Sequence, residues 1–180
     1  MKTLIKLASQ KHTLPILNNV LVSGGYAMAT NIDMVIKSPC TLPDGFYIPH
    51  GILEGVPAAS ALEVGEFPQA VERGELLGTF TIKAAELEIA AWHMGKEETR
   101  YYLKGVCFKG TDMVSTDGHR LTVISGGEYP AHPDFDAGFI VPCYAVKYAI
   151  SLAKEARVSV IEATLHKNRI VFKIGGHELV

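Results

Sequence analysis

The chain has 180 residues, of which 48% are hydrophobic and 20% charged, and its formal net charge is -2 at pH 7. This composition is typical of a soluble globular protein of one or two domains, and it excludes disordered or low-complexity tracts. It also excludes a general attraction to nucleic acid or anionic lipid, and no apolar run approaches the roughly 20 residues that cross a bilayer.

The first part of the chain is predicted to hold one helix and several strands. Hydrophobic periodicity predicts a helix at residues 3–10 and strands at 19–22, 26–30 and 34–37. A further strand-like opening, Gly45-Phe46-Tyr47-Ile48-Pro49, follows them, and the pattern stops soon after it. Between residues 57 and 78, small, acidic and turn-forming residues replace the periodic pattern, which predicts a domain boundary there.

The rest of the chain repeats one order of elements. A strand at 79–82 precedes a helix at 84–94, whose apolar face is predicted to include Trp92 and Met94, and strands at 105–108, 113–115 and 120–124. The last two strands are joined by a predicted hairpin turn at Asp117-Gly118. A strand at 139–141 then precedes a helix at 144–154 and strands at 157–163, 169–174 and 178–180. Thr79-Phe80-Thr81-Ile82 and Gly138-Phe139-Ile140-Val141 open the two units alike.

This internal repeat decides the predicted fold. We expect an α+β protein of duplicated β-α-β-β units, with antiparallel sheets and with the helices packed together on one face. The predicted domains are an abbreviated one at residues 1–72 and a complete one at residues 73–180.

The N-terminus and the cysteines predict a cytoplasmic protein. Met1 to Leu7 lacks the apolar run and the cleavage pattern of a signal peptide. Cys40, Cys107 and Cys143 are odd in number and widely spaced, which fits neither a disulfide framework nor a zinc site. We expect them to behave as small hydrophobic residues.

The cluster Thr116-Asp117-Gly118-His119-Arg120 has two readings. Ser115, Asp117 and His119 are the residue types of a hydrolytic site. A turn at Asp117-Gly118 instead places His119 beyond a chain reversal, and no nucleophile elbow precedes Ser115. Histidines do not recur at metal-ligand spacing, and no glycine-rich phosphate loop is present. The pattern favours a structural turn in a protein that is not an enzyme and that uses neither a metal nor a cofactor.

Several motifs resemble one known family. Arg100-Tyr101-Tyr102-Leu103-Lys104-Gly105 and Thr116-Asp117-Gly118-His119-Arg120-Leu121 resemble the middle domain of the bacterial sliding clamp, the β subunit of DNA polymerase III. The segment from Lys11 to Asn19, then Thr30-Asn31-Ile32-Asp33-Met34 and Phe67-Pro68, resembles the first domain and its junction. The resemblance runs over most of the chain and implies a shortened clamp with the DNA-clamp fold. It implies a processivity factor for DNA replication, built as a ring of domains whose helices surround duplex DNA.

The resemblance also implies a pocket for short linear peptides of polymerases and of the clamp loader. The matching positions are Leu103, Thr116, Gly118, His119, Arg120 and Leu121. Leu103 and Leu121 would form the apolar floor, Gly118 would allow a close backbone approach, and the stem of Arg120 would lie over the peptide. The alternative that both leucines belong to the core stays open.

DNA-binding residues follow from the same resemblance and from one helix face. The resemblance suggests Lys11, Arg100, Tyr101 and Tyr102, since aromatic rings stack on bases and cations reach phosphates. In the helix at 144–154, the polar residues Lys147, Ser151 and Lys154 share one face. The alternatives are a solvated helix face and a tyrosine pair with one ring in the core. Glu86, Glu88, Glu97 and Glu98 depart from a DNA-binding pattern.

The resemblance finally suggests how chains would assemble. If six domains are needed to encircle DNA, a two-domain chain would close as a homotrimer, and a monomer or an open dimer is the alternative. The family continues into a third domain that would complete the peptide pocket. The competing hypothesis is a clamp-like interaction or regulatory module that binds clamp partners without encircling DNA.

Overall fold

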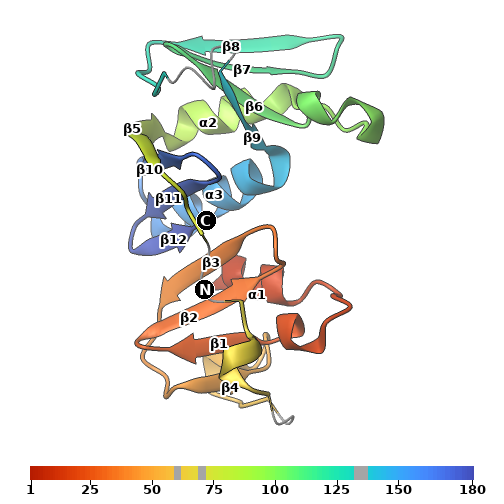
Figure 1. The fold of residues 1–180 in the computed structure, drawn as a ribbon, viewed down its shortest axis with the longest axis vertical. Coiled ribbons are helices and arrows are strands. Elements are labelled where there is room, and N and C mark those ends of the chain that lie inside the picture. Colours follow the sequence, from red (N-terminus) through yellow and green to blue (C-terminus); the bar gives the residue numbers. More distant parts are fainter. Residues whose placement is uncertain (59–61, 69–71, 132–137) are drawn as a thin grey trace. The chain divides into compact units, whose positions relative to one another are not determined.

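The computed structural model describes residues 1–58, 62–68, 72–131 and 138–180. It divides into two compact units. In Figure 1, residues 1–72 of the first unit are coloured from red to yellow and its residues 176–180 dark blue, and the second unit runs from yellow to blue. Unit 1 comprises Met1–Glu72 and Gly176–Val180, and unit 2 comprises Arg73–Gly175. Both are built from antiparallel sheets with few helices, which confirms the predicted fold class. Within these residues, no helix has the length and apolar character needed to span a bilayer.

Unit 1 is one antiparallel sheet with a short helix against it. Its strands run in the order β4-β1-β2-β3-β12, and α1 contacts β2 and β3. Leu4 and Leu7 of α1 are fully buried because they recur on the side of the helix that meets the sheet. The bounds are α1 Lys2–Ala8, η1 Pro15–Asn18, β1 Val20–Ser23, β2 Tyr26–Thr30, β3 Val35–Pro39, β4 Gly45–Tyr47, η2 Ile52–Glu54, η3 Val64–Glu66 and β12 His177–Leu179.

Among the described residues of 73–131 and 138–175, unit 2 contains strands of two sheets and two α-helices. One sheet has the order β8-β7-β6-β9, and in the other β10 pairs with both β5 and β11. The helices α2 and α3 contact each other and strands of both sheets (Figure 1). The bounds are β5 Leu76–Lys83, α2 Ala84–Ala90, η4 Ala91–His93, η5 Glu98–Leu103, β6 Gly105–Lys109, β7 Asp112–Thr116, β8 Leu121–Ser125, β9 Phe139–Pro142, α3 Cys143–Ala156, β10 Val160–His166 and β11 Ile170–Ile174.

The two β-α-β-β repeats of unit 2 exchange their first strands. β5 opens the first repeat but pairs with β10 of the second, and β9 opens the second repeat but pairs with β6 of the first. The rings of Phe80 in β5 and Phe139 in β9 both contact Phe108 in β6, with centroids 5.9 and 5.3 Å apart. This exchange places one aromatic cluster between strands of both sheets, so neither repeat forms its core alone.

The ends of several elements differ from the sequence prediction. The helix predicted to reach Met94 ends at Ala90, and Trp92, predicted on its buried face, is exposed. The buried residues are Leu87, Ala90 and Met94. Their spacing of three and four residues places them on one narrow face of a helix. At the end of α3, Arg157 adopts a left-handed conformation with φ of 56°, so the strand predicted from residue 157 begins at Val160.

The last predicted strand lies in a different place from the one expected. Sequence periodicity assigned residues 178–180 to the second domain. In the structure, β12 pairs with β3, with Glu178 opposite Lys37 and Leu179 opposite Ile36, and it belongs to unit 1. Pairing between residues so far apart in the chain leaves no local pattern from which it could be predicted.

Candidate functional site: the β7–β8 hairpin

The loop between β7 and β8 contains the Asp117-Gly118-His119-Arg120 sequence. Thr116 pairs with Leu121 across its base, so the connection is Asp117 to Arg120, and Arg120, predicted as the first residue of a strand, lies in the loop. The Thr116 hydroxyl donates to the Arg120 carbonyl at 2.7 Å and accepts from the Gly118 N–H at 3.0 Å. Gly118 has φ of 88°, a left-handed conformation that glycine adopts without a steric cost.

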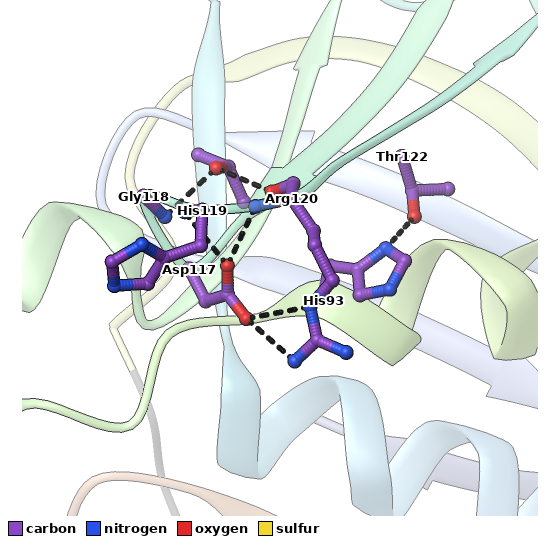
Figure 2. A network of polar contacts seen from close by, with 7 residues as sticks. His93, Asp117, Gly118, His119, Arg120 and Thr122 are labelled. Atoms are coloured by element: carbon purple, nitrogen blue, oxygen red, sulfur yellow. Dashed lines mark hydrogen bonds and ion pairs between the residues drawn. The ribbon is translucent and has the colours of Figure 1, made fainter.

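Asp117 holds the loop together from within (Figure 2). Its Oδ1 accepts from the backbone N–H groups of His119 and Arg120 at 3.0 and 2.9 Å, and its Oδ2 accepts from the Arg120 guanidinium at 3.0 Å. These backbone hydrogen bonds, followed by the contact with Arg120, lower the pKa of the Asp117 carboxyl far below its ordinary value. The carboxylate is therefore an ionised structural acceptor.

The hydrolytic arrangement of Ser115, Asp117 and His119 does not form. Ser115 is buried on the inner face of β7, and its Oγ has no hydrogen-bond partner among the described residues. The His119 ring is exposed and directed away from the Asp117 carboxylate (Figure 2). Within the described ranges, no three His, Cys, Asp or Glu side chains gather where they could hold a metal ion.

Unit 1 contains the same turn between β2 and β3. The Ile32 N–H donates to the Thr30 hydroxyl at 3.0 Å, as the Gly118 N–H donates to Thr116. The Met34 N–H donates to Asn31 Oδ1 at 3.0 Å, as the Arg120 N–H donates to Asp117. Ile32 has φ of 80°, close to that of Gly118. The turn is therefore a repeated feature of the fold and is not by itself a sign of function.

The surroundings of the second turn differ from those of the first. Leu121 is 62% exposed, whereas Val35, at the same place after the first turn, is 1% exposed. Leu121 therefore does not belong to the core. Among the other predicted pocket residues, His119 and Arg120 are exposed, and Thr116 and Leu103 are half-buried.

The η5 segment lies beside this loop. The Leu103 carbonyl accepts from the Gly95 N–H at 2.8 Å, which fixes the end of η5. Arg100 Nη1 lies 3.0 Å from the position that a Cβ of Gly118 would occupy. The structure thus brings Arg100, predicted as a DNA contact, against the loop predicted to bind peptides.

The remaining predicted DNA residues are exposed to different degrees. Tyr101 and Tyr102 are both exposed, with ring centroids 5.7 Å apart in an edge-to-face arrangement, so neither ring lies in the core. Lys11 is exposed in unit 1, and Lys147 and Ser151 are exposed and half-buried in unit 2. Lys154 forms an ion pair with Glu88 of α2, and Lys83 pairs with Glu86 at 2.7 Å. These pairs reduce the positive charge that the helices present.

Sequence analysis did not predict the positions of His93 and Trp92, two residues of η4. The His93 Nδ1 lies 2.6 Å from the Thr122 hydroxyl, a contact that connects η4 to β8 (Figure 2). Trp92, the residue before it, is exposed. The early end of α2 turns Trp92 outward, and no local signal in the sequence marks that end.

The comparisons with known proteins bear on the fold. No protein-family model matches the sequence, and no curated protein matches it. Among solved structures, the DnaN sliding clamp (DNA polymerase III subunit beta) of Bartonella birtlesii bound to griselimycin matches with a TM-score of 0.78 and 23% identity, covering 99% of this chain and 60% of that chain. Pol III beta of Caulobacter crescentus matches with a TM-score of 0.74 and 23% identity, covering 99% and 61%.

A third clamp gives the same result. The Pseudomonas aeruginosa DnaN sliding clamp bound to griselimycin matches with a TM-score of 0.73 and 21% identity, covering 99% of this chain and 59% of that chain. The chain spans about 60% of the length of the first of these structures. Over nearly all of its described length, this protein has the fold of the bacterial sliding clamps.

Proposed function

We propose that the chain is a sliding-clamp-like DNA polymerase processivity factor that binds short linear peptides of polymerases and of the clamp loader and tethers them to duplex DNA. The observation that carries the proposal is the exposed Leu121 side chain at the loop end of β8, in a chain with the clamp fold. Leu121 is exposed there, between Arg120 and the half-buried Thr116. This surface has the residue types that the resemblance assigns to peptide binding.

The energy available from this surface is modest but measurable. Burying a leucine side chain completely contributes about 1.5 to 3 kcal/mol. Because Leu121 is 62% exposed, a peptide that covers it would gain roughly 1 to 2 kcal/mol from this residue alone. Arg120 is paired with Asp117 at 3.0 Å and Arg100 with Glu97 at 3.5 Å, so the expected gain comes from Leu121 and not from these cations.

Truncation of Leu121 tests the proposed peptide site. Leu121→Ala is expected to weaken binding of a fluorescent clamp-binding peptide from a bacterial DNA polymerase about tenfold, measured by anisotropy. Val160→Ala, in the exposed start of β10, is the matched control and should leave binding unchanged. Equal binding by the Leu121→Ala variant and the parent chain would remove the site from the proposal.

The proposed assembly is a closed ring, with three copies of the two-domain chain around duplex DNA. A ring is retained on circular DNA and lost from free ends of linear DNA. Sedimentation would show a species of three times the 19.5 kDa chain mass. A monomer at high protein concentration would contradict the ring.

One observation favours the competing function, a clamp-like interaction or regulatory module that does not encircle DNA. Glu86 and Glu88 of α2 pair with Lys83 at the end of β5 and with Lys154 of α3, which lowers the positive charge that these two lysines offer to phosphate. A module of this kind would bind the polymerase peptide but would show no difference between circular and linear DNA.

A further inference from the structure

The chain contains two Asp-Gly dipeptides, Asp44-Gly45 and Asp117-Gly118. An aspartate that is followed by glycine isomerises readily, because no side chain hinders the approach of the glycine nitrogen to the carboxyl group. Asp44-Gly45 stands at the start of β4 in unit 1, and Asp117-Gly118 lies in the loop between β7 and β8. Because both dipeptides have the same chemistry, their surroundings decide which one reacts.

The isomerisation uses no reagent other than water. The glycine nitrogen attacks Cγ of the protonated aspartate carboxyl, an N–Cγ bond forms, and the N–H proton leaves with the carboxyl hydroxyl as water. Water then adds to one of the two carbonyls of the resulting cyclic succinimide. Opening at Cγ restores aspartate, and opening at the main-chain carbonyl gives isoaspartate. The main chain becomes longer by one carbon atom at unchanged mass, and nothing is oxidised or reduced.

The β7–β8 loop engages both of the groups that would react (Figure 2). The Gly118 N–H donates to the Thr116 hydroxyl at 3.0 Å, so the attacking nitrogen is held in a hydrogen bond. The Asp117 carboxylate accepts from the backbone N–H groups of His119 and Arg120 and from the Arg120 guanidinium. These contacts lower the pKa of the Asp117 carboxyl, so little of it carries the proton that the reaction requires. Attack at this dipeptide therefore needs several hydrogen bonds to break together.

Asp44 is held less firmly. Its side chain is exposed, and among the described residues its carboxylate accepts from one group, the Gly24 N–H, at 3.2 Å to Oδ1 and 3.4 Å to Oδ2. Both distances lie at or beyond the long end of the usual range for N–H···O bonds. Gly45 is the first residue of a three-residue strand, and strand ends open readily. A Cβ at Gly45 would meet no atom within 4 Å in the part of the chain that the structure describes, so the ring has room to close.

We propose that Asp44-Gly45 is a site of spontaneous isoaspartate formation in the folded chain. Asp117-Gly118 is protected from the same reaction by the side chains of Thr116 and Arg120. These two are positioning residues, because they hold the Gly118 nitrogen and the Asp117 carboxylate and need no ligand to do so. Neither assignment depends on the proposed function.

Isomerisation at Asp44 would alter β4 directly. The Tyr47 hydroxyl donates to the Pro43 carbonyl at 2.8 Å, a bond that spans Asp44. Phe46 of the same strand packs against Phe67 in the core of unit 1, with ring centroids 5.9 Å apart. An additional main-chain atom at this point shifts the strand relative to these partners. The isomerised chain is therefore expected to unfold at a lower urea concentration than the parent chain.

Peptide mapping of aged protein tests the inference. The full chain is incubated for several weeks in one buffer, once folded and once in urea that unfolds it. Trypsin then releases residues 38–73 and 110–120, each of which holds one of the dipeptides, and electron-transfer fragmentation distinguishes isoaspartate from aspartate. In the folded chain, isoaspartate should be about tenfold more abundant at Asp44 than at Asp117, since each hydrogen bond that must break slows the attack. In urea the two dipeptides should react alike.

Two variants test the protection of Asp117. Thr116→Val removes the acceptor of the Gly118 N–H and should raise isoaspartate at Asp117 about tenfold, with Asp44 in the same sample as the reference. Arg120→Lys, at an exposed position, replaces two guanidinium contacts to Oδ2 at 3.0 and 3.3 Å and keeps the trypsin site. It should raise isoaspartate at Asp117 about threefold.

Urea unfolding of aged protein gives the second readout. The aged parent chain should develop an additional transition at lower urea, whereas Asp44→Glu, which keeps the carboxylate but makes the ring to be closed larger, should unfold like fresh protein. Equal isoaspartate at the two dipeptides of the folded chain, or more at Asp117, overturns the inference. A folded chain without isoaspartate at Asp44 also overturns it. If Thr116→Val and Arg120→Lys both leave isoaspartate at Asp117 unchanged, the assigned protection is wrong.

Discussion

Neutralising Glu88 is expected to increase affinity for duplex DNA. Glu88 and Lys154 form an ion pair whose side chains are 45% and 61% exposed. Glu88→Gln raises the net charge from -2 to -1 and leaves Lys154 available to a phosphate. One additional phosphate contact makes the slope of log affinity against log salt steeper by about 0.9. Near 0.1 M salt, this corresponds to roughly eightfold tighter binding of the duplex. Stability should change by less than about 1 kcal/mol, because the pair is largely exposed.

Anisotropy of a labelled duplex across several salt concentrations measures this effect. Glu162→Gln is the matched control: it changes the charge equally, but Glu162 alternates in β10 with the buried Ile161 and Ala163. Lys154→Ala in the Glu88→Gln background should remove the gain. The reasoning is refuted if Glu162→Gln steepens the salt dependence equally, since overall charge would then be the cause.

Three further predictions concern stability. Leu87→Ala, at a fully buried position of α2, should lower the free energy of unfolding in urea by about 2 to 5 kcal/mol; a change as small as that of the exposed Ile89→Ala would contradict the assigned core. Thr30→Val removes the buried acceptor of the Ile32 N–H and should cost about 1 to 3 kcal/mol, and an unchanged urea midpoint would show that this bond is dispensable. Burial, aided by the N-terminal amino group, lowers the pKa of His177. Because the unfolded chain then binds the proton more readily, the His177 contribution is complete above about pH 6.5 and is lost as the pH falls. His177→Gln should make the melting temperature depend less on pH between pH 7 and pH 5. A variant whose melting temperature falls as steeply as that of the parent chain would assign the effect to other groups.

Local patterns in the sequence were enough to predict most of the elements. β2 lies at the predicted residues, and α3 includes the predicted helix, because strand alternation and helix periodicity depend only on near neighbours. The structure gives the openings at Gly45 and Gly138 equivalent places, because β4 pairs with β1 and β9 pairs with β6.

Contacts between distant segments could not be predicted in this way. The pairing of β12 with β3, the approach of Arg100 to Gly118 and the ion pair between Glu88 and Lys154 each join parts of the chain with no common local pattern. The candidate site shows the same division. The motif identified Thr116 to Leu121, but the 62% exposure of Leu121 depends on which segments of the fold surround it.

The repeated turn gives this chain an internal reference for its own spectroscopy. The amide signals of Ile32 and Gly118 report on two loops with the same hydrogen bonds to a threonine hydroxyl. Heating or denaturant that loosens this type of loop should disturb both signals, whereas a bound peptide should shift the signal of Gly118 alone. One titration can thus distinguish recognition from partial unfolding without a second protein as a standard.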